Sequence, residues 1–87
     1  MKIYVLTKET TNVETGESNV KVVRVSTDYD KVHKQFEQEQ ISAREELKDY
    51  DNIVERNGYN GDTWVIEEKD NYFMLHTVLQ IRVAHLK

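Results

Sequence analysis

The feature that most constrains this chain is one amphipathic stretch near its middle, residues 27–50. Apolar side chains recur there at steps of three, four or seven residues, which keeps them on one side of a 3.6-residue helix. The stripe consists of Tyr29, Val32, Phe36, Ala43, Leu47, Tyr50 and, just beyond the stretch, Val54. It has one gap, at Glu39 and Gln40, where Ile41 lies off to the side. The pattern predicts an α-helix whose apolar side closes the core.

The ends of this helix are marked by capping and turn residues. Ser26 or Thr27 can cap the first turn, because a side-chain oxygen there accepts a hydrogen bond from an exposed backbone N–H group. Two Asn-Gly pairs follow the helix, starting at Asn57 and Asn60, and both tolerate positive φ angles. We therefore predict that the helix is followed by a loop over residues 51–62.

Residues 2–26 are expected to form a first β-hairpin, because β-branched and aromatic residues are concentrated at both ends of the segment. A tight turn at Thr15-Gly16 would place Leu6 opposite Val25. In that register one side of the hairpin carries Tyr4, Leu6, Val23 and Val25, and the other carries Ile3, Val5, Val20 and Val22.

Residues 63–86 are expected to form a second hairpin, with a two-residue turn at Asp70-Asn71 that would place Ile66 opposite Leu75. The side predicted to face the core carries Trp64, Ile66, Phe73, Leu75, Leu79, Ile81 and Val83. The last strand is longer than its hairpin partner. Its C-terminal half must therefore pair with another strand, most economically one of the first hairpin.

These elements predict a single α+β domain over residues 1–87, in the order β-β-α-β-β. One long amphipathic helix would pack on one face of a four-stranded, mainly antiparallel sheet. Nothing in the chain remains to cover the other face, where the register gathers Ile3, Val5, Val65, Met74 and Val78. A patch of this kind suggests an interface. We expect either self-association through the sheet or its edge, or a monomer that tolerates the patch.

The net charge of −4 is concentrated in one part of the chain. Residues 28–56 contain nine acids and five bases, which sum to −4, while the remaining seven acids and seven bases cancel. This distribution argues against direct nucleic-acid binding, which needs clustered Lys and Arg. It adds a second candidate partner surface at Glu37, Glu45, Glu46 and Asp49, with Tyr59 available for binding in the loop. A solvated helix face of mixed charge is the ordinary interpretation of the same residues.

Motifs for catalysis, metal binding or membrane insertion are absent from the sequence. It has no cysteine, and its three histidines lack the spacing of metal ligands. Its paired carboxylates are expected on the polar side of the helix, in water, whereas general acid–base catalysis needs a carboxylate in a desolvated cleft. We therefore expect no catalytic residue, metal or cofactor, and no enzymatic activity. No apolar run reaches the length of a membrane span or signal peptide, so we expect a cytoplasmic protein that does not bind membranes.

The opening Met1-Lys2-Ile3-Tyr4-Val5-Leu6 is followed by a polar hairpin, a valine-rich strand and a helix capped by Ser, Thr or Asp. This pattern resembles many short uncharacterised proteins of phages and mobile elements, over roughly the first fifty residues. The resemblance implies a small intracellular accessory protein that binds a host factor, and it carries no catalytic residues over to this chain.

Three functions from different classes follow from these observations. The first is a non-enzymatic interaction module that binds another protein or a second copy of itself through the sheet patch or the acidic helix surface. The second is an acidic inhibitor that mimics nucleic acid through the charges between Glu37 and Glu55. The third is a small-ligand binder or enzyme, with a pocket between the helix and the loop at residues 57–62.

Overall fold

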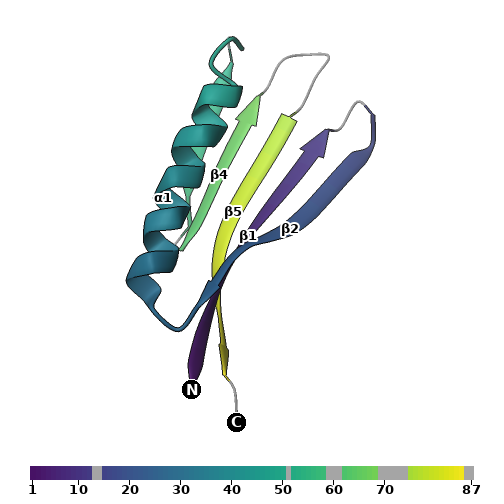
Figure 1. Ribbon diagram of the computed structural model, residues 1–87. Helices are drawn as coiled ribbons and strands as arrows, with labels where there is room; N and C mark the ends of the chain where they lie inside the picture. Colours follow the sequence, from purple (N-terminus) through teal and green to yellow (C-terminus); the bar gives the residue numbers. More distant parts are fainter. Residues whose placement is uncertain (13–14, 51, 59–61, 69–74, 86–87) are drawn as a thin grey trace.

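The computed structural model of the chain is a two-layer α+β structure, in which one helix packs on one face of a five-stranded antiparallel sheet (Figure 1). It describes residues 1–12, 15–50, 52–58, 62–68 and 75–85. The elements are β1 (Lys2–Asn12), β2 (Glu17–Ser26), α1 (Tyr29–Glu46), β3 (Ile53–Asn57), β4 (Thr63–Glu68) and β5 (Leu75–His85). The strand order is β2-β1-β5-β4-β3, so α1 connects the two edge strands of the sheet.

The number of strands differs from the prediction. The α+β class, the single long helix and the antiparallel sheet are confirmed, but the sheet has five strands instead of four. The additional strand is β3, within the segment that the sequence predicts to be a loop. Ile53 is half-buried on the core side of β3, whereas Val54 on the other side is exposed. β3 pairs antiparallel with β4 and gives the element order β-β-α-β-β-β.

The helix α1 is shorter at both ends than the predicted range 27–50. Its N-cap is Asp28 instead of either preceding hydroxyl residue, because the Asp28 carboxylate accepts a hydrogen bond from the backbone N–H of Asp30 at 3.0 Å. Its C-cap is Leu47, whose N–H still reaches the carbonyl of Ala43. The predicted stripe therefore ends at Leu47, and Tyr50 beyond it is exposed.

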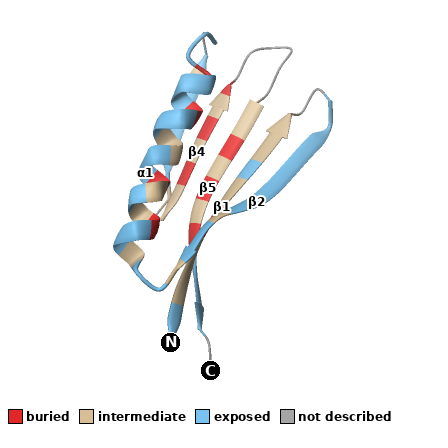
Figure 2. Cartoon of the chain, viewed as in Figure 1, coloured by how far each residue is buried: buried red, intermediate tan, exposed pale blue. Residues whose placement is uncertain are grey.

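The core lies between α1 and the side of the sheet that faces it (Figure 2). In β4, and in β5 from Thr77 to Ile81, every second residue is buried, as expected for strands with one face against a helix. The core residues are Leu6, Val32, Phe36, Ala43, Leu47, Trp64, Ile66, Leu79 and Ile81. All of them belong to the helix stripe or to the inner sides predicted for the two hairpins. Phe73 lies outside the described residues.

The last strand pairs with the first hairpin, as predicted. β5 runs antiparallel to β1 from the pair Lys2–His85 to the pair Asn12–Leu75. Its register with β4 differs from the prediction by two residues, because Ile66 pairs with Thr77. A shift by two residues keeps every side chain on its predicted face. The predicted turn at residues 70–71 lies outside the described residues.

The first hairpin contains a register change that the sequence does not predict. Leu6 pairs with Arg24 instead of Val25, while the neighbouring Thr7 pairs with Val22, so that Val23 occupies a β-bulge. Because a bulge inserts one residue, it reverses which side chains face the helix. Val25 therefore lies opposite Val5 on the uncovered side of the sheet and is exposed.

Candidate functional site

The face of the sheet opposite α1 carries many apolar side chains. No described element packs on it, since α1 occupies the other face. Apolar side chains reach it from all five strands: Ile3, Val5, Val20, Val22, Val25, Val54, Val65 and Val78. We call this surface the open face. Val20 and Val22 on the edge strand β2 are 66% and 60% exposed, and Figure 2 shows β2 exposed along most of its length.

One row of residues crosses the open face from edge to edge. Val20 of β2 pairs with Glu9 of β1, Glu9 with Val78 of β5, Val78 with Val65 of β4, and Val65 with Arg56 of β3. Three valines are thus interleaved with one acid and one base. Paired residues on neighbouring strands have side chains in contact distance, so the row forms a continuous strip of mixed apolar and charged groups.

The charges on the open face cancel. Among the strand residues that the structure describes, the register places two acids on it, Glu9 and Glu67, and two bases, Arg56 and Arg82. Glu67 accepts a hydrogen bond from Arg56 and lies 3.4 Å from Nε2 of His76. The open face is therefore neutral, although the chain carries a net charge of −4.

Four of the five apolar residues proposed from the sequence as a partner surface lie together on the open face. They are Ile3, Val5, Val65 and Val78, all half-buried; Met74 lies outside the described residues. The valines of β2 enlarge this patch. The predicted register already places Val20 and Val22 on the side of Ile3, whereas Val25 joins them only through the bulge.

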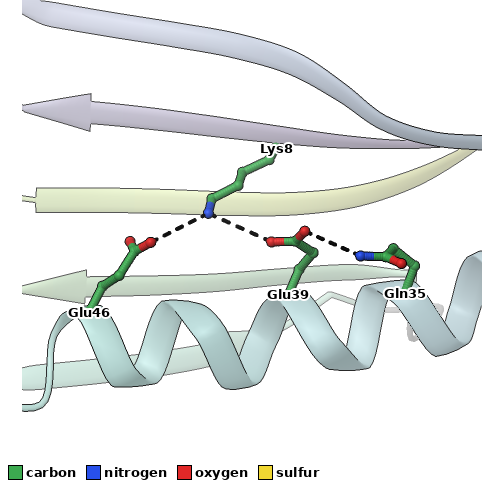
Figure 3. A network of polar contacts seen from close by, with 4 residues as sticks. All are labelled: Lys8, Gln35, Glu39 and Glu46. Atoms are coloured by element: carbon green, nitrogen blue, oxygen red, sulfur yellow. Dashed lines mark hydrogen bonds and ion pairs between the residues drawn. The ribbon is translucent and has the colours of Figure 1, made fainter.

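A second candidate surface is a polar groove between α1 and the β1–β2 hairpin (Figure 3). On its floor the Lys8 Nζ atom lies 3.7 Å from a carboxylate oxygen of Glu39 and 3.9 Å from one of Glu46. Gln35 donates a hydrogen bond from Nε2 to Glu39 at 3.3 Å. The side chains of Lys8 and Glu39 are only 11% and 18% exposed, so this ion pair is largely shielded from water.

This network explains the gap in the apolar stripe of the helix. Glu39 occupies the position where the stripe is interrupted, and β1 presents Lys8 to it from the core side of the sheet. The side of β1 on which Lys8 lies follows from the sequence, since Lys8 continues the two-residue spacing of Tyr4 and Leu6. Lys8 is not among the residues predicted from the sequence, because no local pattern indicates that a strand lysine meets a helix glutamate.

Three hollows lie along the groove. Two of them, of about 220 and 240 Å³, adjoin the Lys8 network and share Thr10, Asn19 and Glu46 in their lining. The third, of about 290 Å³, is lined by side chains of β2 and of the N-terminal half of α1. Its lining residues are Arg24, Lys31, Lys34, Gln35 and Gln38.

The acidic residues proposed as a partner surface do not form one continuous face. Glu37 and Glu46 are nine residues apart, so they project from opposite sides of a 3.6-residue helix. Glu37 lies 3.2 Å from His33, Glu45 forms an ion pair with Lys48, and Glu46 turns toward Lys8. Asp49 is exposed after the helix. The remaining proposed residue, Tyr59, lies outside the described residues, as do residues 60 and 61 of the loop proposed to border a pocket.

Within the ranges that the structure describes, no group of three or more His, Asp or Glu side chains is arranged to hold a metal ion. No described helix has the length and apolar character needed to cross a membrane. Comparison of the chain with models of protein families, with curated proteins and with solved structures gave no match.

Proposed function

We propose that this chain is a non-enzymatic protein-interaction module that self-associates by packing the open faces of two copies against each other. The observation that carries the proposal is the combination of apolar side chains from all five strands with balanced charge on a single uncovered face. Large contiguous apolar patches are rare on monomeric proteins and mark contact sites.

Charge placement favours a second copy as the occupant. Residues 28–56 hold the net charge of −4, and most of them belong to α1, on the far side of the sheet. Two copies that pack through their open faces would place their helices on the two outer sides of the dimer. The electrostatic repulsion between the two acidic segments would then be weakest, because they lie farthest apart. The two acids and two bases of each open face would meet equal numbers of opposite charges across a twofold axis.

The size of the open face is adequate for a dimer. At about 3.4 Å per residue, β1, β2 and β5 are about 34–37 Å long and β3 and β4 about 17–20 Å. With strands about 4.8 Å apart, the five together present on the order of 700 Å². This is close to the roughly 800 Å² per partner of a standard protein interface. Two sheets would stack about 10 Å apart with interdigitated valines, as in a β-sandwich. Neither copy would need to change its fold.

The acidic mimic of nucleic acid has weaker support. Its charges would have to present one continuous negative surface, but Glu37 and Glu46 point in opposite directions, and Glu46 is engaged by Lys8. The open face is a better candidate for contact because its apolar groups gain free energy when they leave water.

Sedimentation equilibrium over a wide concentration range tests the proposal. We expect the wild-type chain to form dimers and Val20→Lys to weaken dimerisation by about tenfold or more, since a charge would be buried at the interface. The new lysine would neighbour Glu9 within its own sheet, which favours retention of the fold. Ile41→Lys is the matched control, because Ile41 is 64% exposed on the outer side of α1, compared with 66% for Val20.

A wild-type chain that remains monomeric at the highest concentration would refute self-association. Equal loss of dimer in Ile41→Lys and Val20→Lys would show that the contact involves the helix instead of the open face.

A further inference from the structure

The third hollow of the groove gathers positive charge that no carboxylate of the described residues neutralises. Arg24 comes from β2, and Lys31 and Lys34 come from the first half of α1. Among the residues that the structure describes, none of these three side chains has a carboxylate within ion-pair distance. By contrast, Lys8, Arg44 and Lys48 each form an ion pair with a glutamate.

This placement of charge opposes the stability of the fold. Lys31 lies in the first turn of α1, where the helix dipole disfavours a cation. Lys34 is three residues further on, so the two ammonium groups are neighbours on the helix surface, and Arg24 adds a third positive charge. Three positive charges thus surround one hollow in a chain that has four excess acids.

We propose that this hollow binds a compact phosphoryl anion, either free phosphate or the phosphate group of a small phosphomonoester. A phosphoryl group carries about −1.5 to −2 charges at neutral pH, which matches three cations better than the single charge of a carboxylate. The planar guanidinium of Arg24 can form paired hydrogen bonds with two phosphate oxygens, and the lysines add point charges.

The amide side chains of the hollow suit the same ligand. Gln35 uses one N–H of its amide for Glu39 and keeps the other available as a donor. Gln38 lines the same hollow and is exposed. Side-chain amides therefore complete a set of donors around the anion.

The flanking charges select a compact ligand over an extended polyanion. Asp28 and Asp30 lie between Arg24 and Lys31 in the chain, and Glu39 and Glu46 line the groove beyond Lys34. A nucleic-acid strand laid along the groove would bring its phosphates close to these carboxylates. The volume of about 290 Å³ is near the lower end of the range for small-molecule sites.

Titration of the ¹⁵N-labelled chain with inorganic phosphate at constant ionic strength, followed by NMR, tests the site. We expect saturable shifts confined to the backbone signals of residues 24, 31 and 34 and to the side-chain amides of Gln35 and Gln38. Lys34→Gln and Arg24→Gln should each weaken binding by about tenfold, because each removes one charge-assisted contact. Lys48→Gln is the matched control and should leave the affinity unchanged, since Lys48 lies beyond the C-terminal end of α1.

The proposal is overturned by shifts that do not saturate, by acetate binding as tightly as phosphate, or by equal weakening in Lys48→Gln and Lys34→Gln. Tighter binding of a single-stranded oligonucleotide through the same residues would also overturn it, in favour of an extended ligand. Titration with glycerol phosphate distinguishes a phosphomonoester ligand from free phosphate. Glycerol phosphate that binds more tightly than inorganic phosphate indicates a phosphomonoester, and equal affinity indicates the free anion. The site lies on the helix side of the sheet, so sedimentation of the same samples reports self-association independently.

Discussion

The phenolic OH of Tyr29 donates a 2.6 Å hydrogen bond to the carboxylate of Asp62, and this contact ties the first turn of α1 to the residue before β4. The carbonyl of Asp62 also accepts a hydrogen bond from the backbone N–H of Ile81 in β5. Tyr29 in turn packs edge-on against Tyr4 of β1, with ring centroids 5.2 Å apart. One residue pair thus links the helix to three strands at the end of the molecule that contains the N-terminus of α1.

The hydrogen bond to Asp62, together with burial and the negative charge of that carboxylate, raises the pKa of Tyr29 from 10.0 to about 12. Since folding raises this pKa, the contribution of the contact to stability is complete below about pH 10 and is lost as the pH rises toward about 12. We expect one tyrosine to titrate near pH 12 by site-resolved NMR. Asp62→Asn should return its pKa toward 10, and Tyr29→Phe should abolish the late titration. If every tyrosine titrates near pH 10 in the wild-type chain, the contact does not form in solution.

Phe36→Ala should lower the free energy of unfolding by about 3–5 kcal/mol, because it leaves a cavity between α1 and the sheet. Phe36 is 3% exposed and belongs to the core cluster. Urea denaturation of the variant measures this loss, which is large for a chain of 87 residues. Ile41→Ala on the exposed side of the same helix should change stability by no more than about 0.5 kcal/mol. Similar losses in the two variants would contradict the assignment of the helix face.

Glu39→Gln should lower the free energy of unfolding by about 1–2 kcal/mol, because Lys8 would remain shielded from water with only the more distant Glu46 as a partner. The same substitution at Glu45 should cost less than about 0.5 kcal/mol, since its pair with Lys48 is exposed to solvent. Urea denaturation at low and high salt distinguishes the shielded pair from the exposed one, because salt screens the exposed pair more strongly. Equal costs at both positions would show that Lys8 and Glu39 are not shielded.

The helix and the faces of the strands were predictable because they depend on local periodicity. The 3.6-residue spacing of Val32, Phe36 and Leu47 identifies the buried side of α1 without any knowledge of its partner. The two-residue alternation in the segment that contains Trp64 and Ile66 does the same for β4. Even the error of two residues in the β4–β5 register left these faces intact, since a strand repeats every two residues.

β3 was not predictable from its own residues. Val54 continues the helical spacing of Leu47 and Tyr50, and charged residues and asparagines surround it, so local propensity favours a helix end followed by a loop. The segment is a strand because the edge of β4 offers unpaired backbone groups with which it pairs. The bulge at Val23 was likewise missed, because pairing on both sides of β1 determines it.

The candidate surfaces also divide into a part that the sequence predicts and a part that only the tertiary structure shows. Part of the open face could be assigned from strand alternation, since Ile3, Val5, Val65 and Val78 occupy outward positions in any register of the correct parity. The Lys8–Glu39 pair and the cationic hollow required the tertiary structure, because each joins residues from a strand and the helix that are not neighbours in sequence.

The sequence by itself determined the α+β class, the single long helix and its buried stripe, and the inward face of each strand in the second hairpin, because periodic patterns encode which side of an element avoids water. The tertiary structure decided the fifth strand, the register within each hairpin and the meeting of Lys8 with Glu39. Those features depend on which segments come together and on which backbone and charged groups then need a partner.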